Sequence, residues 1–259
     1  MFGFLPIPAV IAHRGASAYA PENTLAAFEL AVRQGADAIE LDAKLTADGQ
    51  VVVFHDQTLD RTTGVPGKIH NSKWADLKKL DAGSHFDVAY RSEPIPLLSD
   101  VLDAVGRFTF TNIELTNYNS PFDNLPERVA EIVKRQKMAN RVFFSSFNPI
   151  GLMRIRRLLP KVPISLLAQP GKSGILARSF LIYAIGFDSL NPFLSDATDR
   201  LVSRLHRRKS KVFVYTVNEP DVMRELFDLG VDGIFTDDPL IARRVLSTVR
   251  QQHLKDVNR

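Results

Sequence analysis

Short apolar segments alternate with longer amphipathic segments along almost the whole chain. The apolar segments have the length of β-strands, and the amphipathic segments repeat their apolar residues at helical spacing. This alternation predicts βα units that build a parallel sheet. The expected strands are Ala9–His13, Ala38–Ala43, Thr111–Leu115, Val142–Ser146, Ile164–Ala168, Phe187–Leu190, Val212–Val217 and Gly233–Thr236.

Eight strands that are each followed by a helix predict a closed (β/α)8 barrel, the TIM barrel. The chain has 259 residues, which is about the length that such a barrel needs, so we expect one barrel domain over residues 1–259. Residues 56–96 are polar and rich in turn-forming residues, and they interrupt the alternation. We expect them to form a small insertion on the catalytic rim, where it either shapes the pocket or is a passive excursion.

One further apolar segment, Val51–His55, does not fit the βα alternation. It follows the second strand after only KLTADGQ, which is too short for a right-handed crossover, so it should return as an antiparallel hairpin. Asp48-Gly49 is a strong signal for a two-residue hairpin turn. Counting outward from this turn places Asp42 opposite His55, which would bring a carboxylate and a histidine together at one end of the sheet.

Composition limits the classes of function and of environment. The chain is 45% hydrophobic with a net charge of +4, which leans toward anionic partners without the charge density of a nucleic-acid binder. It has no cysteine, which excludes disulfides and thiolate chemistry and fits a reducing compartment, so we expect a cytoplasmic protein. The N-terminal residues do not resemble a signal peptide, and we expect no transmembrane segment. Peripheral contact with a membrane remains open.

Ionisable residues gather where the expected strands end, which is where barrels place their active sites. These residues are His13, Arg14, Glu40, Asp42, His55, Asp56 and Glu114. Glu40 and Asp42 are two apart on a strand and therefore share a face. Crowded carboxylates repel one another unless a cation lies between them, and Mg²⁺ or Ca²⁺ suits all-carboxylate ligation. The alternative is that Glu40 and Glu114 pair with basic side chains inside the barrel.

The two histidines and the arginine supply the remaining chemistry. His13 and His55 flank the carboxylates, which favours a general acid and base pair over two structural histidines. Arg14 can bind a phosphate with its guanidinium fork, or it can form a salt bridge to a rim carboxylate. Glu22 and Asn23 could cap the following helix or reach back to the ligands.

Ten motifs, in order and spacing, resemble the glycerophosphodiester phosphodiesterase family over residues 11–239. They are HRG, PENT, ELDAKLTADGQVVVFHD, LDRTTG, LDAGS, IPLLSDVL, NIEL, FSSF, YTVN and GVDGIFTDDP. The resemblance implies a barrel enzyme that uses one divalent cation, Mg²⁺ or Ca²⁺, to hydrolyse glycerophosphodiesters to sn-glycerol 3-phosphate and an alcohol. It also implies roles for the rim residues: Glu40, Asp42 and Glu114 as metal ligands, His13 and His55 as acid and base, and Arg14 as the phosphate ligand.

Two positions depart from the family pattern. After NIEL the family usually has lysine, whereas this chain has Thr116, and Lys44 is a candidate for the missing positive contact to phosphate. Near LNPF the family often has His-Pro, whereas this chain has Asn191-Pro192. Both departures concern the choice of substrate more than the chemistry.

Three other functions compete with the small-molecule phosphodiesterase. A lysophospholipase D would use the same rim on a substrate with an acyl chain, and the stretch Gly174–Phe187 bears on it. We expect this stretch to be a barrel helix and strand packed in the core, and exposure of its apolar face beside the rim would favour the lipid enzyme. A non-catalytic phosphate-binding barrel would be free to lose some of the site residues. A nuclease would need an aromatic and basic groove that the sequence does not offer.

Overall fold

The computed structural model describes residues 2–257 and contains a closed barrel of eight parallel strands. β1 pairs with both β2 and β9, which closes the barrel and confirms the predicted TIM barrel. The barrel strands are β1 (Ala9–Ala12), β2 (Ala38–Leu45), β4 (Phe110–Leu115), β5 (Val142–Ser146), β6 (Ile164–Ala168), β7 (Ser189–Pro192), β8 (Lys211–Val214) and β9 (Gly233–Thr236).

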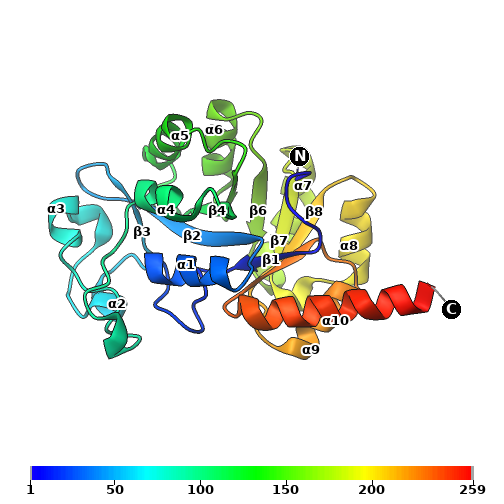
Figure 1. Cartoon of the computed structure of the whole chain (residues 1–259). Coiled ribbons are helices and arrows are strands. Elements are labelled where there is room, and N and C mark those ends of the chain that lie inside the picture. Colours follow the sequence, from blue (N-terminus) through cyan, green and yellow to red (C-terminus); the bar gives the residue numbers. More distant parts are fainter. Residues whose placement is uncertain (1, 258–259) are drawn as a thin grey trace.

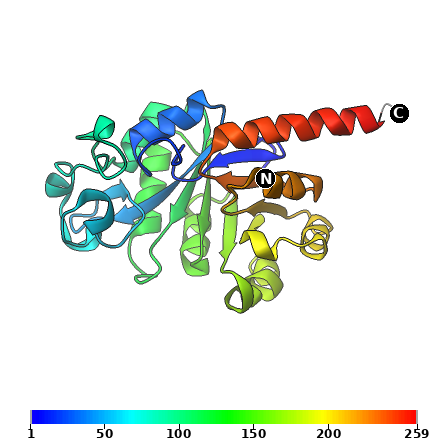
Figure 2. The same ribbon diagram turned by 90° about the horizontal axis from the view of Figure 1, so that it is seen from below.

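Helices connect successive strands and surround the barrel (Figures 1 and 2). They are α1 (Leu25–Arg33), α4 (Leu98–Val105), α5 (Leu125–Arg135), α6 (Pro149–Leu158), α7 (Ile182–Ala184), α8 (Asp199–His206), α9 (Pro220–Asp228) and α10 (Pro239–Val257). The apolar faces of these helices and the outward-facing strand residues form the main core, in which Leu41, Leu98 and Phe144 are fully buried. α10 extends past the body of the barrel in both views.

The strand β3 (Val51–Val53) returns antiparallel to β2, as expected, but its predicted register is wrong by one residue. Ala43 pairs with Val53, so Asp42 lies opposite Phe54 instead of His55. The cause is the turn, because the Thr46 N–H donates to the Gln50 carbonyl at 3.0 Å and leaves three residues in the loop. A three-residue loop replaces the predicted two-residue turn, with its third residue at a φ of 75°.

Several strand ends also differ from the prediction. β1 ends at Ala12 and β8 at Val214, before the polar residues that we expected to complete them. β7 covers Ser189–Pro192, and Phe187 packs into the core before the strand begins. These shifts change the ladder but leave the order of the elements as predicted.

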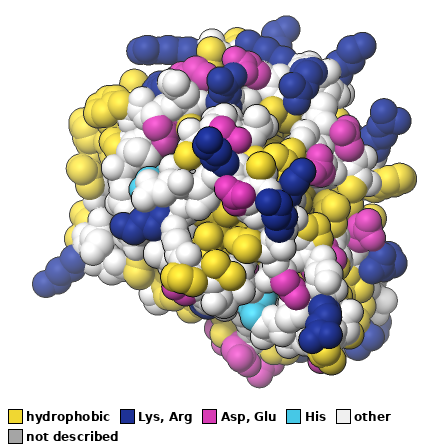
Figure 3. Space-filling view, turned by 90° about the vertical axis from the view of Figure 1, so that its left-hand side faces the viewer, with side chains coloured by type: hydrophobic (Ala, Val, Ile, Leu, Met, Phe, Trp, Pro, Cys, Tyr) yellow, Lys and Arg dark blue, Asp and Glu magenta, His cyan; other side chains and the backbone are white. Residues whose placement is uncertain are grey.

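The segment between β3 and α4 lies beside the end of β2 (Figure 1). It contains α2 (Asp60–Thr63), η1 (Ile69–Asn71), α3 (Trp74–Leu77) and η2 (Val88–Tyr90). Its apolar residues form a separate small core around Phe54, Leu59 and Ile69. Hydrophobic, basic and acidic side chains are interspersed on this side of the molecule (Figure 3).

The barrel interior is apolar at one end and polar at the other. Phe143, Phe213 and Phe235 point inward near the N-terminal ends of their strands, and Phe2 packs against the first two with ring centroids 5.5 and 5.1 Å apart. Closer to the C-terminal ends, the inward positions of β2 and β4 are carboxylates. The apolar plug therefore leaves only the C-terminal end for polar chemistry.

The connection between β1 and α1 bends sharply soon after the strand, where two successive residues are in the left-handed region. Arg14 has a φ of 57° and Gly15 a φ of 87°. A Cβ atom on Gly15 would lie 2.7 Å from the carbonyl carbon of Ala27 on α1. Thr24 caps α1 by accepting a hydrogen bond from the Ala27 N–H, so the helix start is fixed against this turn.

Gly15→Ala should destabilise the protein through both strain and overlap. Gly230→Ala is the matched control, because Gly230 has a similar φ of 82° and no atom within 4 Å of its added Cβ. We expect about 1 kcal/mol for the control and roughly 2 kcal/mol more for Gly15→Ala. Urea denaturation of both variants measures the difference, and equal losses would show that Ala27 yields without cost.

Candidate active site and metal centre

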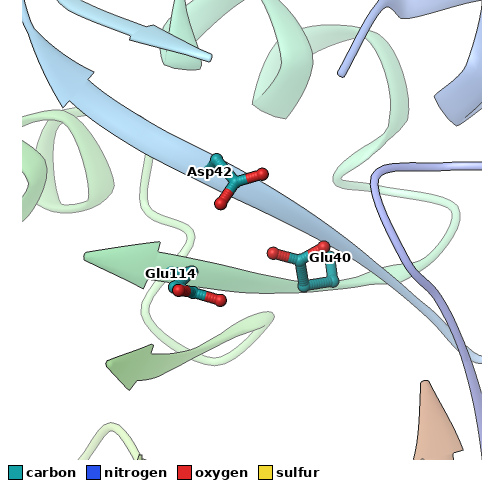
Figure 4. Close-up of side chains that lie close together, drawn as sticks. All are labelled: Glu40, Asp42 and Glu114. Carbon is teal, nitrogen blue, oxygen red and sulfur yellow. The ribbon is translucent and has the colours of Figure 1, made fainter. Parts of the chain in front are cut away.

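Three carboxylates from neighbouring strands meet inside the barrel. Glu40 and Asp42 lie on the inward face of β2, and Asp42 pairs in register with Glu114 on β4. One carboxylate oxygen from each of the three lies within 4.8 Å of the others. Figure 4 shows all three side chains directed toward a common point. The structure therefore brings together the three residues that the sequence predicted as metal ligands.

Burial and mutual repulsion perturb the pKa values of these carboxyls. Burial raises the pKa of Glu40 well above its usual value, and repulsion from Asp42 and Glu114 raises it further. Burial and the charge of Asp42 raise the pKa of Glu114 to about 7. Burial also acts to raise the pKa of Asp42, but the Arg14 guanidinium and other positive neighbours overcome it and hold this pKa below its usual value.

The donor set fits a hard divalent cation. Two unit negative charges at this separation repel by on the order of 3–4 kcal/mol at an effective dielectric constant near 20. The negative charge of three ionised carboxylates exceeds the single positive charge of Arg14. Their oxygen atoms are ligands of the kind that Mg²⁺ and Ca²⁺ prefer. The Tyr118 hydroxyl also donates a hydrogen bond to Glu114. Glu40, Asp42 and Glu114 could therefore hold such an ion.

His13 directly follows β1 and lines a cavity that the three carboxylates also line. Its Nδ1 lies 2.7 Å from Asp237 Oδ1 at the end of β9. Asp237 is held in turn by Asn218, whose Nδ2 donates to Oδ2 at 2.6 Å, and by the Ser17 hydroxyl at 3.1 Å. This arrangement places the proton on Nδ1 and leaves Nε2 for a ligand.

His55 lines the same cavity and is held by a similar arrangement. Its Nδ1 lies 2.7 Å from Asp56 Oδ1, and Arg61 Nε donates to the other Asp56 oxygen at 2.6 Å. Arg61 also donates to both oxygens of Glu22, at 2.8 and 2.7 Å. The β3–α4 segment thus connects one histidine of the site to the β1–α1 turn.

Arg14 joins the turn to the carboxylates. Its backbone N–H donates to Glu40 at 2.9 Å, and its guanidinium contacts Glu22 at 3.1 Å and Asp42 at 3.5 Å. The predicted alternative for Arg14, a salt bridge to a rim carboxylate, is therefore present. Asn23 reaches back as well, since its Nδ2 donates to Asp42 at 2.8 Å. Thr24, and neither Glu22 nor Asn23, caps the helix.

The two positions that depart from the family pattern lie at different depths. Lys44 follows Asp42 on the inward face of β2, and its Nζ donates to Thr116 Oγ1 at 2.8 Å. The candidate replacement for the missing lysine is thus next to position 116. Asn191 is fully buried on β7, and neither polar atom of its side chain has a hydrogen-bond partner among the described residues.

Sequence reasoning did not assign the residues that orient the histidines. Asp237 and Asn218 come from the TDDP and YTVN motifs, and Arg61 comes from LDRTTG, all of which were recognised only as parts of a pattern. Asp237 did carry a signal, because it is a polar residue directly after β9, whereas Asn218 lies in the loop beyond β8 and Arg61 lies on α2. Their partners could not be identified, because β1 and β9 are joined only by barrel closure.

The stretch Gly174–Phe187 is only partly the packed helix and strand that we expected. Ile182 and Phe187 are buried, whereas Ile175, Leu176 and Phe180 are 54%, 58% and 60% exposed. The stretch leaves the C-terminal end of β6 through η3 (Gly171–Gly174) and continues as the π-helical turn η4 (Ala177–Leu181). Its apolar side chains therefore begin at the rim of the barrel. No helix in the described part of the chain is long and apolar enough to cross a membrane.

Comparison with known proteins decides the family. Residues 13–241 match the sequence model of the glycerophosphoryl diester phosphodiesterase family. The chain belongs to this family. The match confirms the resemblance that the motifs indicated and the class of phosphoric diester hydrolases that the resemblance implied.

Individual relatives agree with this assignment. A glycerophosphodiester phosphodiesterase of Caldanaerobacter subterraneus subsp. tengcongensis is 38% identical over 231 residues, which are 89% of this chain and 94% of the relative. A glycerophosphodiester phosphodiesterase of Bacillus altitudinis is 36% identical over 234 residues, 89% of this chain and 94% of the relative. Among solved structures, an Oleispira antarctica phosphodiesterase in complex with the product sn-glycerol-3-phosphate superposes with a TM-score of 0.85. It is 30% identical and covers 95% of this chain and 98% of its own.

Cation binding should release protons, because Glu40 and Glu114 hold them when no ion neutralises the cluster. With the pKa of Glu114 near 7, affinity for Mg²⁺ or Ca²⁺ should rise as pH increases through neutrality. The same raised pKa makes the metal-free protein lose stability as pH rises from the ordinary glutamate value toward 7, since the unfolded state gives up its proton first. Added cation should therefore raise Tm more at about pH 8 than at about pH 6.

Isothermal titration calorimetry in two buffers of different ionisation enthalpy counts these protons. Glu114→Gln should weaken binding and reduce the proton release, whereas Glu131→Gln, an exposed carboxyl on α5, should change neither. Cation affinity that is independent of pH would remove the two glutamates from the ligand set.

Proposed function

We propose that this protein hydrolyses glycerophosphodiesters to sn-glycerol 3-phosphate and an alcohol, with the help of one divalent cation. The observation that carries the proposal is the cavity of about 240 Å³ lined by His13, Arg14 and His55 together with the three carboxylates. Two histidines, each held at Nδ1 by a carboxylate, line this cavity together with the cluster of possible cation ligands. The product named for the Oleispira antarctica relative is the one that this reaction would form.

The charged residues would bind and polarise the phosphate. Glu40, Asp42 and Glu114 would hold Mg²⁺ or Ca²⁺, which supplies positive charge against the phosphate and the glycerol hydroxyls as charge builds in the transition state. Arg14 would bind a phosphate oxygen with the part of its guanidinium that Glu22 does not use. Asn23 holds Asp42 in place, because its amide donates to the Asp42 carboxylate and accepts a hydrogen bond from the Asp42 backbone N–H.

The two histidines would move the protons. One takes the proton of the nucleophile through Nε2, and the other gives its proton to the leaving alkoxide as the P–O bond breaks. Asp237 and Asp56 would stabilise whichever imidazolium forms. The nucleophile is either water or the glycerol 2-hydroxyl, and internal attack by the hydroxyl would pass through a cyclic phosphate.

A second candidate function, a lysophospholipase D, is favoured by the exposed apolar residues after β6. Ile175, Leu176 and Phe180 could contact an acyl chain or a lipid surface beside the site. For location and partners, the prediction stays a cytoplasmic protein that acts on a small molecule, contacts membranes at most peripherally and does not bind nucleic acid.

Release of sn-glycerol 3-phosphate tests the proposed reaction directly. Purified protein with Mg²⁺ or Ca²⁺ should release it from soluble glycerophosphodiesters, and a chelator should abolish the release. Lysophosphatidylcholine, with and without detergent or vesicles, is the parallel substrate, and its hydrolysis is followed by choline release because the phosphate product would keep its acyl chain. Activity confined to the lysolipid would replace the proposal with the lysophospholipase D, and no activity on either substrate would favour the non-catalytic barrel.

Asp237→Asn should reduce kcat by about 10²-fold or more with little change in Tm, because the amide cannot hold the Nδ1 proton of His13 as the carboxylate does. His13→Ala and His55→Ala should each lose about 10²- to 10⁴-fold. Asp238→Asn is the matched control, since Asp238 contacts Tyr19 and the start of α10 but not His13. Equal turnover in the two asparagine variants would contradict the orienting role of Asp237.

A further inference from the structure

A second cavity, of about 390 Å³, has in its lining Lys44, which lies two residues after Asp42 on β2. It lies between the ends of β2 and β4, the β3–α4 segment and the β4–α5 loop, and its polar lining includes Lys44, Gln57, His70, Thr116 and Asn119. Lys44 follows Asp42 on the inward face of β2, just as Thr116 follows Glu114 on β4. The cavity therefore begins one step of the strand ladder, about 6.6 Å, outward of the carboxylates.

Lys44 brings a positive charge to the boundary between this cavity and the carboxylates. Its ammonium donates one hydrogen bond, to Thr116 Oγ1, and Thr116 in turn donates to the Ala43 carbonyl at 2.7 Å. Across residues 2–257 the ammonium makes no salt bridge, and the carboxylates of Asp42, Glu114 and Asp56 attract it only from a longer distance. Two of its three N–H donors therefore remain for a ligand.

Apart from Asp123, the rest of the lining contains no lysine, arginine or carboxylate, and it mixes polar residues with the apolar Leu45, Ala47, Ile69 and Leu125. The side chains of Gln57, His70 and Asn119 make no hydrogen bond to any other residue that the structure describes. The one carboxylate in the lining, Asp123, is already engaged by Asn117 at 2.9 Å, by Ser120 at 2.7 Å and by the N-terminal turn of α5. No phenylalanine, tyrosine or tryptophan is part of the lining, although quaternary ammonium groups are typically bound on such rings.

We propose that this cavity binds the alcohol part of the glycerophosphodiester and selects neutral polyhydroxy alcohols, such as glycerol or inositol, over cationic choline or ethanolamine. Lys44 repels a cationic alcohol, while the amides and His70 exchange hydrogen bonds with hydroxyl groups. This inference rests on the proposed phosphodiesterase activity and names the substrate class within it.

Another cavity, which His13 lines, is rich in carboxylates and would suit a cationic alcohol. Its lining includes Glu22, Asp237 and Asp238. These carboxylates are engaged within the protein: Glu22 by Arg61, Asp237 by His13 and Asn218, and Asp238 by Tyr19. An alcohol placed there finds fewer free polar groups than in the cavity at Lys44, which is why the latter is assigned to the alcohol.

The test compares kcat/KM of the full chain, with Mg²⁺ or Ca²⁺, for glycerophosphoglycerol, glycerophosphoinositol and glycerophosphocholine. We expect the two neutral diesters to exceed the choline diester by about tenfold or more. Equal values, or a preference for the choline diester, would overturn the inference while leaving the phosphodiesterase activity established. Failure to hydrolyse any of the three would instead contradict the proposed function and the inference with it.

Lys44→Met distinguishes selection by charge from an effect that is the same for all three substrates. It should narrow the ratio between neutral and choline diesters by about tenfold, chiefly by improving the choline diester relative to the others. Lys161→Met, an exposed lysine at the opposite end of the barrel before β6, should leave the ratio unchanged. An equal loss on all three diesters would show that Lys44 acts on the shared phosphate and would contradict its role in selection.

Two exposed amides give a version of the test that does not depend on Lys44. Gln57 and Asn119 lie on the surface, so Gln57→Ala and Asn119→Ala should leave folding unaffected, and circular dichroism checks this. Each should raise KM for the inositol and glycerol diesters several-fold with little change for the choline diester. Unchanged KM values for all substrates in both variants would place the alcohol outside this cavity.

Discussion

The repulsion among three carboxylates inside the barrel is the constraint on which the rest of the site depends. Glu40, Asp42 and Glu114 converge within 4.8 Å, and burial alone would drive protons onto them. Arg14 offsets part of this charge through its guanidinium and its backbone N–H. A cation would offset the remainder, and it would do so in the cavity that both histidines line.

The barrel confines this unfavourable cluster to one end. Aromatic residues close the interior near the N-terminal strand ends, so the inward positions of β2 grade from Ala38 through two carboxylates to Lys44. The parts of the site are therefore ordered along β2. The phosphate would lie at the carboxylates and Arg14, and the alcohol would lie one step outward, where the lining becomes basic and neutral.

Periodicity and strand ends predicted the barrel and the residues that meet in it, because both depend on local patterns that the sequence displays. Glu40 and Asp42 share a face by strand geometry alone, and the parallel pairing of β4 with β2 places Glu114 beside them. The hairpin register was wrong because Thr46 and Gln50 close a three-residue loop around Asp48-Gly49. The Asp237 partner of His13 was not predicted, because it lies 224 residues away and only closure brings it near. The exposure of Ile175 was not predicted either, since an apolar residue carries no sign of which face of a helix it occupies.

The most direct test of the account is a crystal structure of the protein grown with Mn²⁺, which scatters anomalously and takes oxygen ligands as Mg²⁺ does. We expect one anomalous peak at coordination distance, about 2.2 Å, from carboxylate oxygens of Glu40, Asp42 and Glu114. The same map should show the Nε2 atoms of His13 and His55 directed toward this ion's open side. A complete anomalous map with no peak there, or with its peak at other residues, would contradict the claim that these carboxylates form the metal centre.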